Sequence, residues 1–519
     1  MAPRTGRGPA VTPRIPDLDF SAIVPLLFVA VGAMVVLMGE VFLSRAKSIQ
    51  GKPVTATLVG SALGLTSIAF LALSCWVSLL AFGMGGIAEF DVGRPIFQLD
   101  PFSSFVSAMV TLAALLACAL SIDYLAELRI NHGEFYALLL LSTCGMLLMI
   151  AAVDLIAVFV GLELMSIPIY VLAGFDRRKL RSNESAMKYF LIGSFASAVM
   201  LYGMALLYGA SGSTAFTALR VGFELHPTLA TIGMGLVLVG FAFKVSAVPF
   251  HQWTPDVYEG APSAVTAFMS VTVKATAFAA LIRLLGMGLG PLDEALSNVV
   301  WVLAALTMVV GNLMAVIQTN VKRLLAYSSI GHAGYLLIGV LTGTPESYGA
   351  IVFYLLAYVF MNLGAFGVVV VLAHRGHDCD RIDSFAGLSR VRPGLAALMT
   401  LFLLSLAGIP ATVGFMAKFT LFLAAVHSGY VGLVILAVLM SAVSVYYYLR
   451  IPVLMYMREP GDEKPRMEIS TGEVFVLVVC AIAVVFLGLF PNHAMLPLVG
   501  EFHVLDWSRE SVSLLFGAG

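Results

Sequence analysis

The chain has 519 residues, of which 60% are hydrophobic and 11% are charged, with a net charge of −1 and a mean hydropathy of +0.98. A soluble core of this length would carry far more charge, so the composition predicts a polytopic membrane protein and suggests no nucleic-acid partner. The five cysteines form no CxxC pair, and no glycine-rich phosphate loop is present. We therefore expect no metal, iron-sulfur or nucleotide site on this chain.

The amino-terminal tail, residues 1–20, is basic and contains proline. It precedes a long apolar stretch without a small-residue cleavage site, which favours a retained first helix over a cleaved signal. The expected fold is an all-α polytopic membrane protein, because stretches of about 20 apolar residues recur along the chain. They predict fourteen transmembrane helices, near residues 21–44, 55–83, 103–122, 134–153, 155–174, 186–210, 228–250, 260–285, 297–318, 324–343, 347–373, 393–425, 429–457 and 471–490.

Basic residues predict the orientation of these helices, because Lys and Arg accumulate in cytoplasmic loops. If the amino terminus faces outward, nineteen of the 29 Lys and Arg residues fall in cytoplasmic loops and seven fall in outer segments. The cytoplasmic group includes Lys188, Lys322 and Arg323, and the outer group includes Arg283. This distribution predicts that both termini lie outside.

Four ionisable residues lie inside predicted helices: Glu163, Lys244, Lys274 and Lys418. Charges inside a membrane are costly and often mark an ion path. Burial disfavours the charged form of an amine, so a buried lysine can exchange a proton near neutral pH, and a nearby carboxylate opposes that effect. We interpret the three lysines as stations for a small cation, most simply H+, and Glu163 as the acid that acts on Lys244.

A short repeat accompanies two of these lysines. VGFAFK ends at Lys244, and VGFMAK ends at Lys418, five predicted helices later. Because five is odd, the two copies would cross the membrane in opposite directions, as in transporters with inverted repeats. Helix breakers lie near both, Pro249 beside the first and Gly408 and Pro410 beside the second. Interrupted helices at matching places in two halves point to an ion site.

Structural alternatives stay open for each charged position. Buried lysines could lock two helices through ion pairs or extend toward headgroups. Lys188 follows a glutamate by four residues, so a surface ion pair explains it as well as a proton station does. His251 and His332 could relay protons or could be hydrogen-bonded packing residues. Asp256 and Glu259 lie at predicted helix ends, where solvated or capping roles suffice.

At these positions the sequence resembles the antiporter-like membrane subunits of respiratory complex I, the proton-pumping NADH:quinone oxidoreductase. These subunits are related to Mrp-type cation/proton antiporter subunits. The resemblance covers most of the chain, and its most specific segments are FKVSAVPFHQWTPDVYEGAPSAVTAFMSVTVK, GLELMSIPIYVL, NVKRLLAYSSIGHAGY and LAGIPATVGFMAKF.

The resemblance implies two inverted five-helix repeats and discontinuous helices 7 and 12. Residues 21–153 would form helices 1–4, residues 134–285 the first repeat with helices 4–8, residues 297–457 the second with helices 9–13, and residues 471–519 the last helix and tail. It also implies a bacterial inner membrane location, and as partners the other membrane subunits of the complex, lipid and protons. No cofactor is expected on this chain, with NAD, FMN, iron-sulfur clusters and quinone on other subunits.

Carried over residue by residue, the resemblance implies a modulating ion pair of Glu163 and Lys244. Lys274 would be the central connecting lysine, and Lys418 the station that releases protons outward. Lys188 matches a lysine of the sixth helix in the family. The tail of residues 1–20 has no role in this pattern.

Three other classes of protein compete with a proton-translocating complex I subunit. The first is a subunit of a multi-subunit Na+/H+ antiporter, with the same fold and lysines but no redox partner. The second is a membrane scaffold whose charges only hold helices together. A self-sufficient solute carrier is the weakest, because no second polar cluster suited to an organic substrate is apparent in the sequence.

Overall fold

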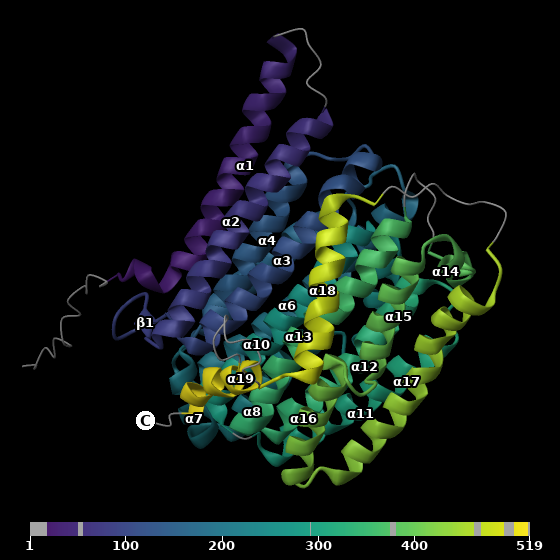
Figure 1. The fold of residues 1–519 in the computed structure, drawn as a ribbon. Helices are drawn as coiled ribbons and strands as arrows, with labels where there is room; N and C mark the ends of the chain where they lie inside the picture. Colours follow the sequence, from purple (N-terminus) through teal and green to yellow (C-terminus); the bar gives the residue numbers. More distant parts are fainter. Residues whose placement is uncertain are drawn as a thin grey trace, which may run out of the picture.

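The computed structural model describes residues 18–49, 56–290, 292–373, 380–460, 469–492 and 503–516. Residues 1–17, most of the predicted tail, lie outside the described residues. In the described part the chain is a bundle of α-helices with one short two-stranded sheet (Figure 1). The prediction of an all-α polytopic membrane protein is confirmed.

Thirteen helices of the described part are long and apolar enough to cross a membrane. They are α1 (Val24–Ile49), α2 (Ala56–Met84), α3 (Pro101–Glu127), α4 (Gly133–Ala151), α5 (Leu155–Ala173), α6 (Leu180–Ser211), α8 (Pro227–Val245), α10 (Ser263–Leu284), α11 (Glu294–Val316), α12 (Val321–Thr342), α13 (Pro345–Leu372), α17 (Val431–Met457) and α18 (Thr471–Leu489). The remaining predicted helix, the twelfth, near residues 393–425, is two shorter apolar helices, α15 (Pro393–Ala407) and α16 (Val413–His427). Every predicted crossing therefore has a counterpart.

Short elements connect these helices. They are η1 (Phe20–Ile23), β1 (Ala88–Glu89), β2 (Gln98–Leu99), α7 (Phe216–Leu225), α9 (Trp253–Gly260), the turn η2 (Leu285–Leu289), η4 (Ile382–Phe385), α14 (Leu388–Val391), α19 (Val504–Ser513) and η5 (Leu514–Phe516). Strand β1 pairs with β2 in antiparallel register, Ala88 opposite Leu99. Elements β1, α7 and α19 lie at one end of the bundle and α14 at the other (Figure 1).

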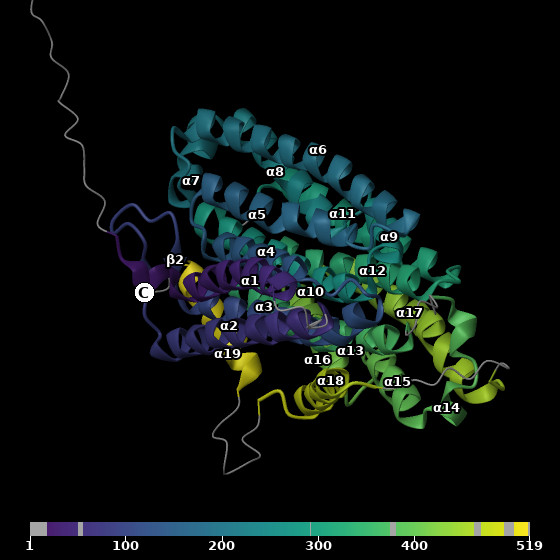
Figure 2. The same ribbon diagram turned by 90° about the horizontal axis from the view of Figure 1, so that it is seen from above.

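Helices α10, α12 and α13 form the centre of the bundle (Figure 2). The apolar stretches of α10 and α12 are buried throughout inside the protein, whereas that of α2 is mostly exposed. Exposed apolar side chains suit contact with lipid, because the surrounding hydrocarbon is as apolar as they are. Lys274 and Arg283 on α10 are therefore shielded from lipid by protein.

The seventh crossing is interrupted after α8. Ser246 adopts a left-handed conformation, with φ of 66°, and residues 246–252 are not helical before α9 begins. The freed backbone groups have side-chain partners, because the Trp253 indole donates to the Phe243 carbonyl at 3.2 Å and the Val248 amide donates to the Thr307 hydroxyl at 2.9 Å. Such internal partners allow an irregular backbone at membrane depth.

The twelfth crossing is interrupted between α15 and α16. Gly408, with φ of +89°, ends α15 in the left-handed region, where glycine is favoured. A side chain at this position would also lie 3.2 Å from the Nζ atom of Lys418. The glycine therefore both turns the chain and leaves room for the lysine. Breaks in helices 7 and 12 agree with the expectation drawn from the resemblance.

The matching hexapeptides do not place their lysines equivalently in these interrupted helices. Lys244 lies in the last turn of α8, before its break, whereas Lys418 lies in α16, after its break. The hexapeptide match is therefore a local similarity and does not define the register of a repeat. The two inverted repeats over residues 134–285 and 297–457 stay a prediction.

Two basic residues assigned to loops are instead buried. Arg283, counted with the outer segments, is fully buried at the end of α10 and binds Asp100 at 2.6 Å. Lys322, counted with the cytoplasmic loops, is 4% exposed in α12 and donates to the Ala261 carbonyl at 3.0 Å. Both lie near helix ends, where position along the sequence does not reveal whether a neighbouring helix covers the side chain.

Candidate functional site

Lys244 lies in a buried pocket of aromatic and hydroxyl groups. Its amine donates to the Ser166 hydroxyl of α5 at 2.7 Å and to the Tyr170 hydroxyl at 3.5 Å. The amine also lies 5.5 Å and 5.8 Å from the ring centres of Tyr170 and Tyr189. Aromatic faces attract a cation, so this pocket can hold the charged amine without a carboxylate in direct contact.

Glu163 lies on α5, one helical turn before Ser166. In the part of the chain that the structure describes, it forms no salt bridge with Lys244, although the two charges interact electrostatically. One of its carboxylate oxygens, Oε1, is buried without a hydrogen-bond partner. The structure thus brings the predicted pair to one region, with the Ser166 hydroxyl as the direct partner of the amine. An unpartnered buried oxygen favours a change of partner or a bound water there.

Lys274 lies at the centre of the bundle on α10. The residue is 2% exposed, and its amine donates to both the backbone carbonyl and the hydroxyl of Ser329 on α12. The Tyr258 hydroxyl of α9 also lies against Ser329. The side chain therefore does not extend to lipid headgroups, and the snorkelling alternative does not describe it.

His332 lies one turn after Ser329 on α12, in a shell of tyrosines. Its Nδ1 atom is 2.6 Å from the Tyr354 hydroxyl, and its Nε2 atom is 3.1 Å from the Tyr448 hydroxyl. The imidazole also lies 5.9 Å from the ring centre of Tyr335, the ring that borders Lys418. A ring with a hydroxyl at each nitrogen can accept a proton on one side and donate one on the other.

Lys418 lies beyond the second break. Its amine donates to the Ala407 carbonyl at the end of α15 at 2.8 Å and to the Ser441 hydroxyl of α17 at 2.9 Å. The amine also lies 5.3 Å from the ring centre of Tyr335 on α12. A helix carboxyl terminus carries partial negative charge, so the end of α15 stabilises the protonated amine.

Helix α12 contacts both Lys274 and Lys418. Ser329, His332 and Tyr335 are spaced three residues apart and so share one face of this helix. Ser329 binds Lys274, and the Tyr335 ring lies beside Lys418. The interval from Lys274 to Lys418 is thus lined by polar groups of one helix.

The interval between Lys244 and Lys274 is bordered by aromatic rings. Among the described residues, no chain of hydrogen-bonded side chains joins the two amines. Instead, Tyr189 stacks on Trp253 at 4.3 Å between ring centres, and Trp253 contacts Tyr258 at 6.5 Å. A proton crossing this interval needs water or a movement of these rings.

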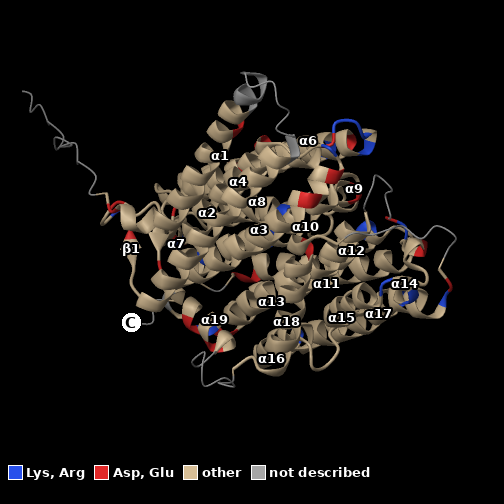
Figure 3. Cartoon of the chain, turned by 45° about the horizontal axis from the view of Figure 1, so that its top comes forward, with Lys and Arg blue, Asp and Glu red and all other residues tan. Residues whose placement is uncertain are grey.

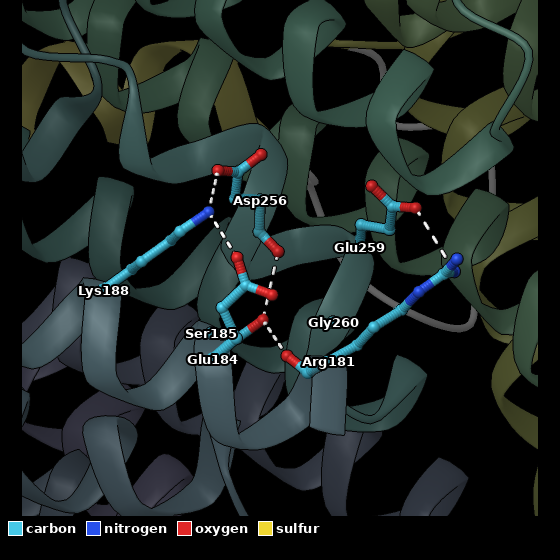
Figure 4. A pocket seen from close by; sticks show the side chains of 7 residues that line it. All are labelled: Arg181, Glu184, Ser185, Lys188, Asp256, Glu259 and Gly260. Atoms are coloured by element: carbon cyan, nitrogen blue, oxygen red, sulfur yellow. Dashed lines mark hydrogen bonds and ion pairs between the residues drawn. The ribbon is translucent and has the colours of Figure 1, made fainter. Parts of the chain in front are cut away.

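Lys188 and His251 lie apart from these buried groups. The Lys188 side chain is 40% exposed, and its amine lies 2.7 Å from both Glu184 and Asp256 (Figure 4). The surface ion pair foreseen as the alternative for Lys188 is therefore present, with a second acid that the sequence did not indicate. His251 lies in the break between α8 and α9, half-buried, with a buried Nδ1 atom that has no hydrogen-bond partner.

Sequence reasoning missed the hydroxyl groups that surround the charged residues, namely Ser166, Ser329, Tyr354, Ser441 and Tyr448. For α5 and α12 a signal existed. Ser166 and Tyr170 follow Glu163 at three and seven residues, and Ser329 precedes His332 by three, which are helical spacings. For Tyr354, Ser441 and Tyr448 only the tertiary structure reveals the contact.

One group of described residues has ligand atoms close enough to share a metal ion. Glu40, on α1, and His132 and Glu134, at the start of α4, bring one such atom each within 4.8 Å of one another. All three are at least partly exposed, and exposed groups of this kind commonly exist without an ion. The geometry alone assigns no metal to them.

Comparison with known proteins identifies the family. The family profile described as "NADH:quinone oxidoreductase/Mrp antiporter, TM" matches residues 152–444. The chain is 43% identical to NADH-quinone oxidoreductase subunit N of Trichlorobacter lovleyi, covering 96% of this chain and 98% of that protein. It is 42% identical to subunit N of Myxococcus xanthus, covering 93% and 97%.

Solved structures of proteins from the same family are also similar to this chain. A chain of respiratory complex I from Thermus thermophilus with bound aureothin superposes with a TM-score of 0.75 and 34% identity, covering 90% of this chain and 97% of that chain. A chain of the Mrp complex from Dietzia superposes with a TM-score of 0.81 at 23% identity, covering 96% and 98%, which shows a common fold.

A bundle with buried lysines beside two interrupted helices is thus a fold found in membrane subunits of respiratory complex I and of Mrp antiporters. The chain belongs to the NADH:quinone oxidoreductase/Mrp antiporter membrane-subunit family. Within that family it is similar over nearly its full length to proteins named subunit N of NADH-quinone oxidoreductase.

Proposed function

We propose that this chain translocates protons as a membrane subunit of NADH:quinone oxidoreductase. Quinone reduction on other subunits would shift charge at one end of its row of buried ionisable groups and drive H+ along Glu163, Lys244, Lys274 and Lys418, with His332 between the last two. The observation that carries the proposal is the face of α12, which places Ser329 against the amine of Lys274, Tyr335 beside that of Lys418, and His332 between these two residues.

The residues can perform the transfer as follows. A protonated Lys274 releases its proton to the hydroxyl side of α12, and His332 takes up a proton at one ring nitrogen and releases one from the other. Lys418, held against the negative end of α15, accepts a proton there and later releases it toward the outside. Each group returns to its starting protonation state, so the net change is one H+ moved from the cytoplasmic side.

In this proposal Glu163 determines when the amine of Lys244, the first lysine of the path, is protonated. Its carboxylate lies close enough to interact with Lys244, and the Ser166 hydroxyl holds the amine in its present position. A shift of the amine from Ser166 toward the carboxylate would favour the protonated form, and a shift away would favour release. No redox group is needed on this chain, because NAD, FMN, iron-sulfur clusters and quinone would lie on other subunits.

The location and orientation are proposed on the distribution of charge. Lys and Arg gather around the ends of α6, α12 and α14 (Figure 3), which are the ends opposite β1 and α19. In a bacterial inner membrane this basic end would face the cytoplasm, and both termini would lie in the periplasm. The other membrane subunits of the complex and lipid would cover the exposed apolar faces.

Replacing Lys244 or Glu163 by alanine tests the proposal. Each change should lower NADH-driven proton uptake by inverted membrane vesicles by at least about tenfold, because a proton-transfer group typically contributes two or more orders of magnitude. Assembly is checked in the same membranes by NADH:ferricyanide activity, which depends on the redox subunits. Full pumping in both variants would refute the assignment.

The competing function is that of a Na+/H+ antiporter subunit, favoured by the common fold with the Mrp complex. Purification in mild detergent separates the two. Flavin and iron-sulfur subunits should accompany this chain, whereas co-purification of antiporter subunits alone would favour the competitor.

A further inference from the structure

Six charged side chains form one network at the end of the bundle where α6 and α12 begin and α9 ends. Along the network the charges alternate in the order Glu184, Lys188, Asp256, Arg323, Glu259 and Arg181. Five of the six, all except Arg323, line a cavity of about 140 Å³ (Figure 4). We call these six residues the six-charge network.

The two acids of α9, Asp256 and Glu259, pair with basic residues of both α6 and α12. Asp256 lies 2.7 Å from Lys188 of α6 and 2.8 Å from Arg323 of α12. Glu259 lies 3.0 Å from Arg323 and 3.5 Å from Arg181. Arg323 and Glu259 are 28% and 22% exposed, whereas Arg181 at the end of the network is 72% exposed. Water therefore screens the central pairs least, and these are the pairs that hold α9.

Helix α9 depends on such contacts for its position. It has eight residues, and residues 246–252 separate it from α8. The peptide after it leads directly into Pro262 and α10, so no helical continuity fixes it at either end. Side-chain contacts with α6, α8 and α12 must therefore fix its position.

The inner side of α9 reaches the surroundings of two amines. Trp253 stacks on Tyr189 with an angle of 6° between the rings, and Tyr189 is one of the rings around Lys244. Tyr258 lies against Ser329, the partner of Lys274. The same eight residues therefore border the interval between Lys244 and Lys274, which no hydrogen-bonded chain crosses in the described part of the protein.

We infer that the six-charge network is a latch that holds α9 in place, and that Asp256 and Arg323 are positioning residues for proton transfer between Lys244 and Lys274. The inference rests on the proposed function. Loss of the charge on Asp256 removes one pair between α9 and α6 and one between α9 and α12. Lys188 keeps Glu184 and Arg323 keeps Glu259, so the change leaves no cation of the network unpaired. The Ser185 hydroxyl still donates to the Asp256 carbonyl at 3.1 Å, so the helix is loosened rather than detached.

Asp256→Asn and Arg323→Gln test the latch in the assembled complex. Both variants should lower proton uptake per NADH oxidised on the order of tenfold, because a small displacement of reacting groups has effects of this size or larger. Backbone hydrogen exchange in residues 253–260 should become faster by about tenfold, since local opening is easier. Asp256→Glu keeps the charge and should restore most of the pumping.

Arg220→Gln is the matched control, because Arg220 pairs with Glu224 on α7 at 3.7 Å and touches neither α9 nor a buried lysine. It should change neither measurement. Wild-type pumping in Asp256→Asn, or unchanged exchange in residues 253–260, would overturn the inference.

Pumping by Lys274→Ala in the same vesicles tests the proposed function separately from the latch. Loss of pumping in Lys274→Ala together with normal pumping in Asp256→Asn defeats only the latch. Normal pumping in Lys274→Ala defeats the proposed function itself. If Asp256→Asn prevents assembly, Arg323→Gln takes its place as the test. If both variants prevent assembly, Asp256→Glu takes their place. Normal pumping by Asp256→Glu with slow exchange in residues 253–260 supports the latch, whereas normal pumping with fast exchange there refutes it.

Discussion

At the scale of single residues, the partners of the three buried amines differ in kind. Lys244 binds hydroxyls within an aromatic pocket, Lys274 binds a serine, and Lys418 binds the carbonyl at the end of a helix. None of the three forms a salt bridge within the described residues. A direct carboxylate partner would hold each amine in its charged form, so these neutral partners leave the proton easier to exchange.

His332 is the residue on which the second interval depends most. His332→Phe keeps a ring of similar size but removes both hydrogen bonds to Tyr354 and Tyr448. Proton uptake by vesicles should fall by about tenfold or more, because no other imidazole is placed between the two lysines in the described structure. His427→Phe, at an exposed histidine 60% accessible to solvent, is the control and should pump normally. Equal pumping by the two variants would exclude a relay through His332.

At the scale of elements, a buried ion pair ties α10 to α3. Arg283 at the end of α10 contacts both carboxylate oxygens of Asp100, the residue that caps α3, and also donates to the Ile150 carbonyl at the end of α4. The pair is fully covered by protein. It anchors the helix that carries Lys274 at the end opposite the six-charge network.

Asp100→Asn should therefore destabilise the fold without touching the proton path. Removing one partner of a buried pair leaves an uncompensated charge and costs about 3–5 kcal/mol. The thermal unfolding midpoint of the purified protein should drop, whereas the ratio of protons moved to NADH oxidised should stay unchanged in the complexes that do assemble. A changed ratio would place the pair in the transport path instead.

At the scale of the whole molecule, the two ends of the bundle differ in charge, and this difference predicts the orientation. The test uses a variant in which the five native cysteines are replaced. A single cysteine then replaces Ser384, in η4 near α14, or Ser513, at the end of α19; both serines are exposed. A membrane-impermeant maleimide should label Ser384→Cys from the cytoplasmic side and Ser513→Cys from the periplasmic side. The reverse labelling would invert the proposed direction of transport.

The sequence alone predicted most of the fold. Each of its fourteen crossings is present, because a stretch of about 20 apolar residues is stable in a bilayer only as a helix, whatever surrounds it. It missed α7, α9, α14 and α19, which are too short to give that signal. It also carried the predicted crossing near residues 228–250 past Val245, where the helix ends.

The charged residues inside the apolar stretches were visible in the sequence, since their cost in hydrocarbon makes them exceptional. Their partners were not. The contacts of Ser329 with Lys274, of Tyr448 with His332 and of Ala407 with Lys418 join helices far apart in the chain. The same holds for Arg283 and for the acids of α9, which looked like loop and helix-end residues. Local composition fixes which segments enter the membrane, whereas the packing of those segments against one another decides which polar groups meet.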